Sequence, residues 1–309
     1  MAGTVAIADT SMSIIGFVLV DRWLLHTLIG VSFGLLLFLV SSGFTLTFGL
    51  ARFVTLSHGA TFLFAAHVAA SVDESSSFAA AVGAAVVAGL LVSLAVFALA
   101  AVRWRTVTSD PTRQVLFTFG CLLIISDVVR DRWGGIPRSV LVPAGLDGSV
   151  ELGGSSFPLY RVFVMAAALV VAAGLWWLQE RTRFGALVRA GADDREQLEA
   201  MGVRTSFLNV AVFGLSGALA GLAAGLGAPI LGASVGQEFS MLIFALVAVV
   251  IGGLGSLKGA LIASVVVGLV DAYGKAWLPT FASFTVMALV VVVLAIRPHG
   301  LIARGAGAR

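Results

Sequence analysis

The sequence predicts an all-α fold, a polytopic bundle of about eight to nine transmembrane helices that forms a single membrane-spanning domain over residues 1–309. Hydrophobic residues make up 59% of the chain and charged residues only 11%, whereas a soluble globular domain has roughly 25% charged residues. Several apolar stretches reach the length of about 20 residues that a helix needs to cross a hydrocarbon core. Lys and Arg also concentrate in alternate connections, as they do in multi-pass membrane proteins.

Nine apolar segments follow one another along the chain, which makes nine the upper limit for the number of spans. The second segment, 59–70, is too short to cross a membrane alone, so we expect a half-helix or a re-entrant piece there. Residues 4–20 are a weaker apolar stretch, interrupted by Asp9, and an interfacial position is our interpretation of them. The nine segments are 24–50, 59–70, 78–102, 114–129, 159–178, 207–228, 240–257, 259–274 and 281–296.

Basic residues predict the orientation, because Lys and Arg are retained on the cytoplasmic side of a membrane. The connections 103–113, 180–206 and 297–309 hold 11 of the 19 Lys and Arg residues. We therefore expect a multi-pass protein of the bacterial inner (plasma) membrane with a cytoplasmic C-terminus. The first 20 residues contain no Lys or Arg, so we expect the N-terminus to be retained. Since the basic residues are scattered, they indicate no nucleic-acid partner.

Two connections are long. The outer connection, 130–158, is rich in Gly and Pro and predicts turns with a short hairpin. In the inner connection, 180–206, Asp193 or Asp194 can cap a short helix that carries Leu198 and Met201 on one face and ends at Gly202. Such a helix between two spans is either a docking element or a solvated loop helix.

Glycine, with 36 copies, is the most informative residue type. Small residues at four-residue spacing let neighbouring helix backbones approach closely, and this spacing occurs at Gly30 and Gly34, at Gly217, Gly221 and Gly225, and at Gly255 and Gly259. The run 251–259 contains four glycines, each costing a continuous helix about 1 kcal/mol relative to Ala. Gly252, Gly253 and Gly255 are therefore candidates for a cytoplasmic gate, and a tight turn between two spans is the alternative.

A second unusual segment covers 49–60, where Arg52, Ser57 and His58 interrupt apolar sequence. Polar and ionisable groups at membrane depth usually face a bundle interior or a cavity, although an interfacial position would require no special function of them. The candidate pathway residues of this region are Thr45, Thr47, Ser57, His58 and Gly59.

The enzyme-like motifs of this sequence lack the structural context that their chemistry requires. The stretch from Gly30 to Gly34 matches a nucleophile elbow, but it lies inside a span instead of a strand-turn-helix. The stretch from Gly214 to Gly217 resembles the serine motif of rhomboid proteases, which need a histidine in a later span, and only His299 follows Ser216. The sequence has no metal-binding pattern and no phosphate loop. We therefore expect no catalytic residues, no metal and no cofactor bound by this chain.

Three segments together resemble the permease subunits of branched-chain amino acid ATP-binding-cassette importers, in the first of that family's two permease types. They are 43–59, 183–203 and 250–260, the last accompanied by the tail 297–301. The resemblance implies an importer permease fold that moves a small polar solute, with branched-chain or related amino acids as the first expectation. It also implies a second permease subunit, more often a different chain than a copy, cytoplasmic ATPases that use the ATP, a periplasmic solute-binding protein and contact with membrane lipid.

The resemblance also assigns the short inner helix to coupling with the ATPase. The residues that it implicates are Ala192, Asp193, Asp194, Glu196, Leu198, Ala200, Met201 and Gly202. The segment lacks the longer Glu-Ala-Ala signature of many importers, and the outer connection has no recognisable match. The substrate range therefore stays open among amino acids, urea and short amides, and carboxylates.

The alternative is a stand-alone secondary transporter or channel for a small solute such as urea or an amide. Transporters of that class usually carry membrane-embedded acids for ion or proton coupling. Here Asp271 is the one acid well inside a predicted span, and it lies near an end. This scarcity favours coupling to ATP.

Overall fold

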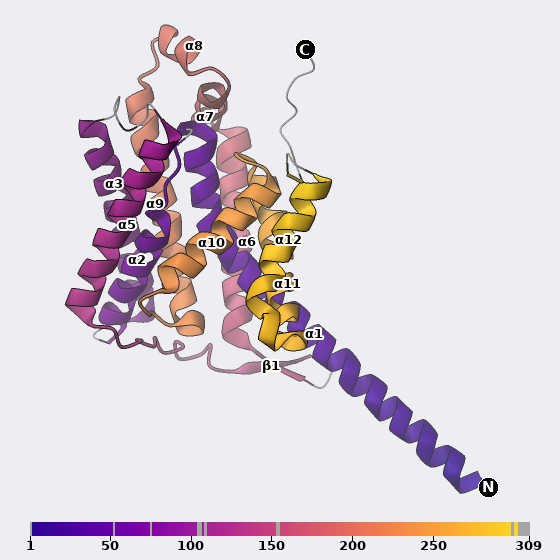
Figure 1. Ribbon diagram of the computed structural model, residues 1–309. Coiled ribbons are helices and arrows are strands. Elements are labelled where there is room, and N and C mark those ends of the chain that lie inside the picture. The colour runs from indigo at the N-terminus through magenta and orange to yellow at the C-terminus, as the bar shows by residue number, and fades with distance from the viewer. Residues whose placement is uncertain are drawn as a thin grey trace.

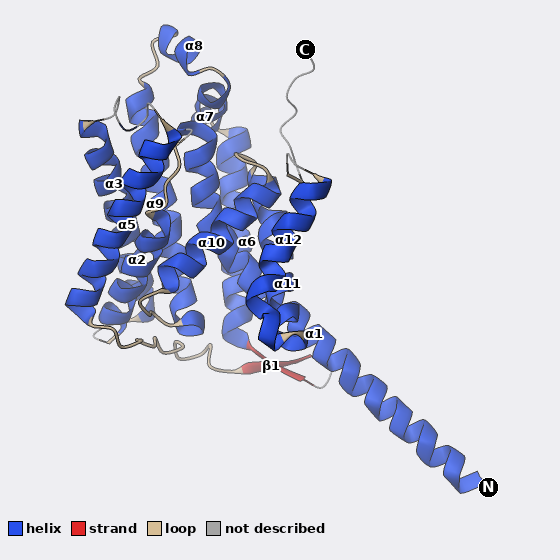
Figure 2. Ribbon diagram, in the orientation of Figure 1, coloured by secondary structure: helices blue, strands red, loops and turns tan. Residues whose placement is uncertain are grey.

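Helices run back and forth between two ends of the molecule (Figures 1 and 2). The computed structural model describes residues 2–51, 53–74, 76–103, 107, 110–152, 155–297, 300 and 301. The elements are α1 (Ala2–Leu46), its π-helical continuation η1 (Thr47–Ala51), α2 (His58–Asp73), α3 (Phe78–Val102), α5 (Pro111–Trp133), the strands β1 (Ser149–Leu152) and β2 (Ser155–Pro158), α6 (Leu159–Arg181), α7 (Arg183–Asp193), α8 (Arg195–Ala200), α9 (Thr205–Leu231), α10 (Gln237–Gly252), α11 (Leu257–Trp277), the short 3-10 helix η2 (Pro279–Phe281) and α12 (Ala282–Ile296).

Each predicted apolar segment coincides with a helix, which confirms the helical membrane fold. Within the described residues, six helices are long and apolar enough to cross a membrane, and the shorter apolar helices are 237–252 and 284–296. The count of eight to nine spans is not confirmed. Residues 4–20 are not a separate segment, because α1 begins at Ala2 and continues without interruption into the bundle.

The two ends of the bundle differ in what they carry (Figure 1). One end, here called the α8 end, carries α7, α8 and the last residues of α12. The other, here called the hairpin end, carries the antiparallel strands β1 and β2, where Val150 pairs with Phe157. These strands confirm the short hairpin predicted in the outer connection.

Glycines hold two pairs of long helices in close contact, as the four-residue spacing predicts. A Cβ placed on Gly268 of α11 would lie 2.3 Å from the Gly30 carbonyl oxygen of α1, and one on Gly217 of α9 would lie 2.3 Å from the Gly89 carbonyl oxygen of α3. The pairs α1–α11 and α3–α9 can therefore form only where side chains are absent. The third predicted pair is wrong, because Gly255 lies in a turn instead of on a helix face.

The helices form an internal repeat that the sequence analysis missed. His58, Asp73 and Phe78, which bound α2 and begin α3, have counterparts 179 residues further on in Gln237, Gly252 and Leu257, which bound α10 and begin α11. In Figure 1, α1 runs from the hairpin end to the α8 end and α9 runs back. The units α1–α2–α3 and α9–α10–α11 are thus an inverted repeat, of the kind from which many transporters are built.

Candidate functional site

The inner connection folds into two short helices at the α8 end (Figure 1). The Asp194 carboxylate accepts a hydrogen bond of 3.0 Å from the backbone N–H of Gln197 and so caps α8. Asp193 is the last residue of α7 and is not the cap. Gly202, with φ of +84°, follows the helix end as predicted, since a glycine tolerates the left-handed conformation there.

Leu198 of α8 and Met201, the residue that follows the helix, differ in exposure. Leu198 is buried and belongs to the main core, whereas Met201 is 77% exposed. The prediction that they share one face is therefore wrong. Leu198 anchors the segment, while Glu196, Ala200 and Met201 are exposed at the tip. The side chains of Ala192 and Asp193 lie outside the described residues.

The glycine run forms a tight turn between α10 and α11. Gly252 ends α10, Gly253 and Gly255 have φ of +94° and +82°, and the Ser256 hydroxyl caps α11 by accepting from the Gly259 N–H at 3.1 Å. The predicted interruption is confirmed as a turn between two helices. Whether these glycines also gate a pathway stays a prediction.

The segments that carry the family resemblance meet around this turn. A Cβ on Gly49 of η1 would lie 3.1 Å from the Cα of Gly255. The Leu301 N–H donates a 2.7 Å hydrogen bond to the Ile251 carbonyl. Helix α7 also packs against η1. The inner connection, the end of α1 and the glycine turn are therefore in mechanical contact at the α8 end.

Residues 53–57 run from η1 back into the bundle before α2 begins. Their backbone is extended or turned, and helix α5 satisfies it: the Gln114 side chain accepts from the Val54 N–H and the Thr118 hydroxyl from the Leu56 N–H, each at 3.1 Å. Non-helical backbone survives at membrane depth only with such partners. The short apolar segment expected here forms the 16-residue helix α2, and Ser57 and His58 at its start are buried. Whether α2 is a half-helix or a re-entrant piece stays a prediction.

His58 lies between α1 and α9. Its Nε2 is 3.0 Å from the Val40 carbonyl oxygen, and because a carbonyl can only accept, His58 donates from Nε2 and leaves Nδ1 as an acceptor. The Ser216 hydroxyl lies 3.5 Å from Nδ1. The expectation that Ser216 has no base within reach is therefore wrong, since this histidine precedes it in the sequence but adjoins it in space.

Ser216 and His58 border a small cavity whose lining is partly polar and partly apolar. Thr47, Ser57 and Thr61 also line it, with Thr55, whose buried hydroxyl has no partner in the described part of the chain. The cavity volume is about 10 Å³, and a space of that size holds at most one water molecule. In this conformation there is no room for a solute or for a substrate of acyl transfer.

Two residues near this cavity behave differently from the sequence-based prediction. Thr45 does not line it, and its hydroxyl donates to the Ser41 carbonyl within α1 at 2.8 Å. Ser93 lines it and donates to the Phe213 carbonyl at 2.7 Å. Sequence reasoning missed Ser93, although it is the one polar side chain in residues 78–102, which is the signal that could have identified it.

The starts of the short helices α2 and α10 cross each other. A Cβ on Gly59 would lie 2.3 Å from the Glu238 carbonyl oxygen, so Gly59 permits the crossing. The Glu238 side chain is buried, and its Oε2 accepts from the Gly236 N–H at 2.7 Å. This buried acid was not among the predicted site residues, because the apolar segment of the sequence begins at 240, after Glu238.

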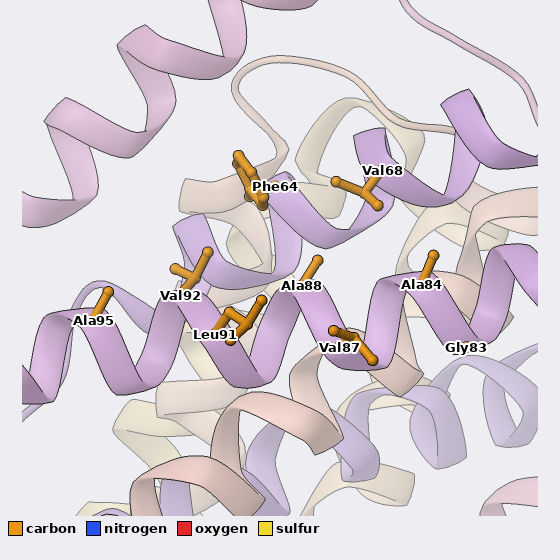
Figure 3. A pocket seen from close by; sticks show the side chains of 9 residues that line it. All are labelled: Phe64, Val68, Gly83, Ala84, Val87, Ala88, Leu91, Val92 and Ala95. Atoms are coloured by element: carbon orange, nitrogen blue, oxygen red, sulfur yellow. The ribbon is translucent and has the colours of Figure 1, made fainter.

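An apolar groove lies between α2 and α3 (Figure 3). Phe64 and Val68 from α2 face Leu91 and Val92 from α3, and the groove has a volume of about 630 Å³. No polar side chain lines it, so it offers a polar solute no hydrogen-bonding group. Among the residues whose side chains are described, no three His, Cys, Asp or Glu residues are grouped as a metal ion would require.

Comparisons with known proteins agree on one family. The family model for the permease component of branched-chain amino acid transport systems matches residues 27–296. The high-affinity branched-chain amino acid transport system permease protein LivH of Escherichia coli (strain K12) is 25% identical over 300 residues, covering 89% of this chain and 94% of the relative. LivH of Salmonella typhimurium is 24% identical with the same coverage. The BraD permease of Pseudomonas aeruginosa is 22% identical over 292 residues, again covering 89% of this chain and 94% of the relative. No solved structure matches this chain.

Proposed function

This chain belongs to the family of branched-chain amino acid transport system permease components, and from that premise we propose that it is the membrane-spanning permease subunit of an ATP-binding-cassette importer. As a multi-pass membrane protein of this family it is a transporter component. The observation that carries the proposal is the match over 27–296, supported by relatives aligned over 94% of their length. The proposed cargo is a small polar solute, branched-chain or related amino acids in the first place, because the aligned relatives are named for that transport.

In the proposed mechanism, cytoplasmic ATPases drive alternating access by pushing on α8. Leu198 anchors this segment in the core while the neighbouring residues stay exposed for a partner. Helix α7 contacts η1, and η1 contacts the turn at Gly255. Displacement of α7 would therefore shift the end of α1 against the start of α11, next to the closed cavity at His58. Ala192, Asp193 and Gly202 belong to the same proposed coupling segment.

We propose eight to nine membrane segments, with α10 and α12 as short spans and α2 as a half-span beside the six long helices. The α8 end, with the C-terminus, would face the cytoplasm of a bacterial inner membrane. A second permease subunit, ATPases that bind the ATP and a periplasmic solute-binding protein would complete the assembly. The apolar groove of Figure 3 suits contact with lipid acyl chains or with an apolar helix.

A stand-alone secondary transporter is the second candidate function. Two buried acids, Glu238 and Asp271, favour it, because embedded carboxylates are the usual means of proton or ion coupling. Glu238 bonds to the backbone and Asp271 to Lys275, so both carboxylates already have partners in this conformation.

The test uses the tagged full-length chain purified from its own host in mild detergent. We expect an untagged ATPase to co-purify, and labelled leucine to enter proteoliposomes only with ATP and the cognate binding protein. Uptake without ATP that an ionophore abolishes would instead establish the secondary transporter. The variant Leu198→Pro should still be inserted in the membrane but should lose ATP-driven uptake, so it shows whether uptake depends on the segment around α8.

A further inference from the structure

An open pocket lies at the hairpin end of the bundle, where α10 begins, α11 ends and α12 starts. Its volume is about 570 Å³, within the range of about 300–1,000 Å³ that is typical of small-molecule sites. Gln237, Ser240, Asp271 and Lys275 contribute polar groups to its lining, and Met241 and Val286 are among its apolar residues. The pocket is therefore amphipathic, unlike the apolar groove between α2 and α3.

An ion pair forms part of the pocket lining. The Lys275 ammonium lies 2.6 Å from Oδ2 of Asp271, with the Asp271 side chain 9% exposed and the Lys275 side chain 63% exposed. The carboxylate has a second oxygen and the ammonium has further N–H groups. Both members of the pair can thus accept an additional partner of opposite charge without separating.

Gln237 adds an acceptor that has no partner. Its Oε1 is buried, and in the described part of the chain no donor lies within hydrogen-bonding distance of it. The Nε2 group of the same side chain makes a long 3.5 Å contact with the Leu231 carbonyl. A buried acceptor without a donor carries a desolvation penalty, and a rotation of the Gln237 side chain, which lines the pocket, would expose Oε1 to the N–H groups of a ligand.

The internal repeat indicates that the fold does not require these charges. At the spacing of 179 residues, Asp271 and Lys275 correspond to Val92 and Val96 of α3. Val92 lines the apolar groove of Figure 3, whereas Val96 lines the small cavity at His58, which is the counterpart of this pocket in the first unit because His58 and Thr61 correspond to Gln237 and Ser240. Since valines occupy both positions in the first unit, the shared helix fold forms there without a charged pair.

We propose that this pocket binds a zwitterionic α-amino acid with an apolar side chain. The ligand ammonium would bond to Asp271 and to Oε1 of Gln237, the ligand carboxylate to the Lys275 ammonium, and the side chain would lie against Met241 and Val286. The inference rests on the proposed function and names where its solute is held. A phosphatidylethanolamine headgroup has the same paired charges, so the experiment separates the two sources.

The first experiment measures protection of a cysteine in the pocket. The full chain with Cys121→Ser and Ser240→Cys, together with its co-purifying subunits, is placed in phosphatidylcholine nanodiscs and labelled with a thiol reagent. We expect millimolar L-leucine to slow labelling, and leucinamide and 4-methylpentanoate, which each retain one charge, to need about tenfold higher concentrations or more. Equal protection by the three compounds would overturn the proposal, as would protection by phosphatidylethanolamine with none by leucine.

The second experiment changes the ion pair. Lys275→Met and Asp271→Asn should each weaken leucine protection about ten- to a hundredfold, by loss of a charge-assisted hydrogen bond, and Lys275→Arg should retain most of it. Arg132→Met and Asp131→Asn on α5 remove exposed charges at the same end of the bundle and should change nothing. Unchanged protection in folded Lys275→Met, judged by monodisperse size exclusion, would also sink the inference.

Uptake measurements keep this inference separate from the proposed function. Leucine protection of the pocket without any ATP-driven uptake would leave the pocket standing and reject the importer. ATP-driven leucine uptake whose KM is unaltered by both Lys275→Met and Asp271→Asn would support the importer and reject the pocket. Uptake with a raised KM in both variants supports the two together.

Discussion

The contact between Gly49 and Gly255 provides the sharpest test of a moving element at the α8 end. Replacing Gly255 by leucine puts a side chain on a residue with φ of +82°, and its Cβ would lie 3.2 Å from the Cα of Gly49. The left-handed conformation costs about 1–2 kcal/mol and overpacking about 1–3 kcal/mol, so we expect a destabilisation of about 2–5 kcal/mol in this conformation. About 1.4 kcal/mol corresponds to a factor of ten in an equilibrium constant, so the population of this conformation should fall at least tenfold. Uptake should fall with it.

Matched variants separate the causes of that loss. Gly49→Ala adds only the contact, since a Cβ there would be 3.1 Å from the Gly255 Cα, whereas Gly255→Asn reduces the conformational strain because asparagine tolerates positive φ. Leu254→Ala, at a side chain that is 60% exposed, should stay within about 0.5 kcal/mol of wild type. Gly174→Ala, where a Cβ would meet nothing within 4 Å, is the neutral control.

The assays are ATP-driven leucine uptake in proteoliposomes and thermal unfolding in detergent. A gate should also give ATP-dependent thiol labelling of single cysteines at 252–258 in a Cys121→Ser background. If Gly255→Leu and Gly49→Ala transport normally and these cysteines stay unreactive, the gate hypothesis is refuted and only the packed turn remains.

Three further predictions follow from the described contacts. Asp194→Ala removes the cap of α8 and should cost that helix about 1 kcal/mol, lowering ATP-driven uptake while co-purification of the permease assembly persists; normal coupling of uptake to ATP hydrolysis would contradict it. We expect uptake and unfolding temperature to stay near wild type in Ser32→Ala and in Ser216→Ala. The Ser32 hydroxyl is buried without a partner in the described residues, and the contact between the Ser216 hydroxyl and His58 is long. Loss of uptake in both variants, at normal expression, would show that these hydroxyls act in transport. Gly268→Ala places a Cβ 2.3 Å from the Gly30 carbonyl oxygen and should destabilise the bundle by about 1–3 kcal/mol. The unfolding temperature should therefore be lower than that of Gly174→Ala. Equal unfolding temperatures would refute the packing argument.

Apolar runs and glycine spacing predicted most of the helices and two of the three close helix contacts. These features are local in the sequence, and a span must satisfy its own backbone. The cap at Asp194 was likewise a local feature. By contrast, the neighbourhood of Ser216 could not be predicted, because His58 reaches it from 158 residues earlier. Met201 was misplaced because a six-residue helix has too few residues to define a face.

The buried acid and the open pocket were missed for a related reason. Glu238 is a buried residue in the first turn of α10, whereas hydropathy windows exclude an acidic residue from the start of an apolar segment. The spacing of 179 residues between the two units is present in the sequence, and comparing the chain with itself would have aligned Gly89 with Gly268 and Val92 with Asp271. That comparison would have marked the charged pair of α11 as exceptional from the amino-acid sequence alone.

The exchange of partners between the two units has a consequence for how the protein is made. Helix α1 packs on α11 and α3 packs on α9, so neither three-helix unit contains its own closest contacts. At a synthesis rate of about 5–20 residues per second, roughly 10–50 s separate the emergence of α1 from that of α11. During this interval the backbone at Gly30 and Gly34 is exposed, because the helix that packs against it has not yet been made. We therefore expect the yield of this permease to depend on factors that protect unpaired membrane helices until translation is nearly finished.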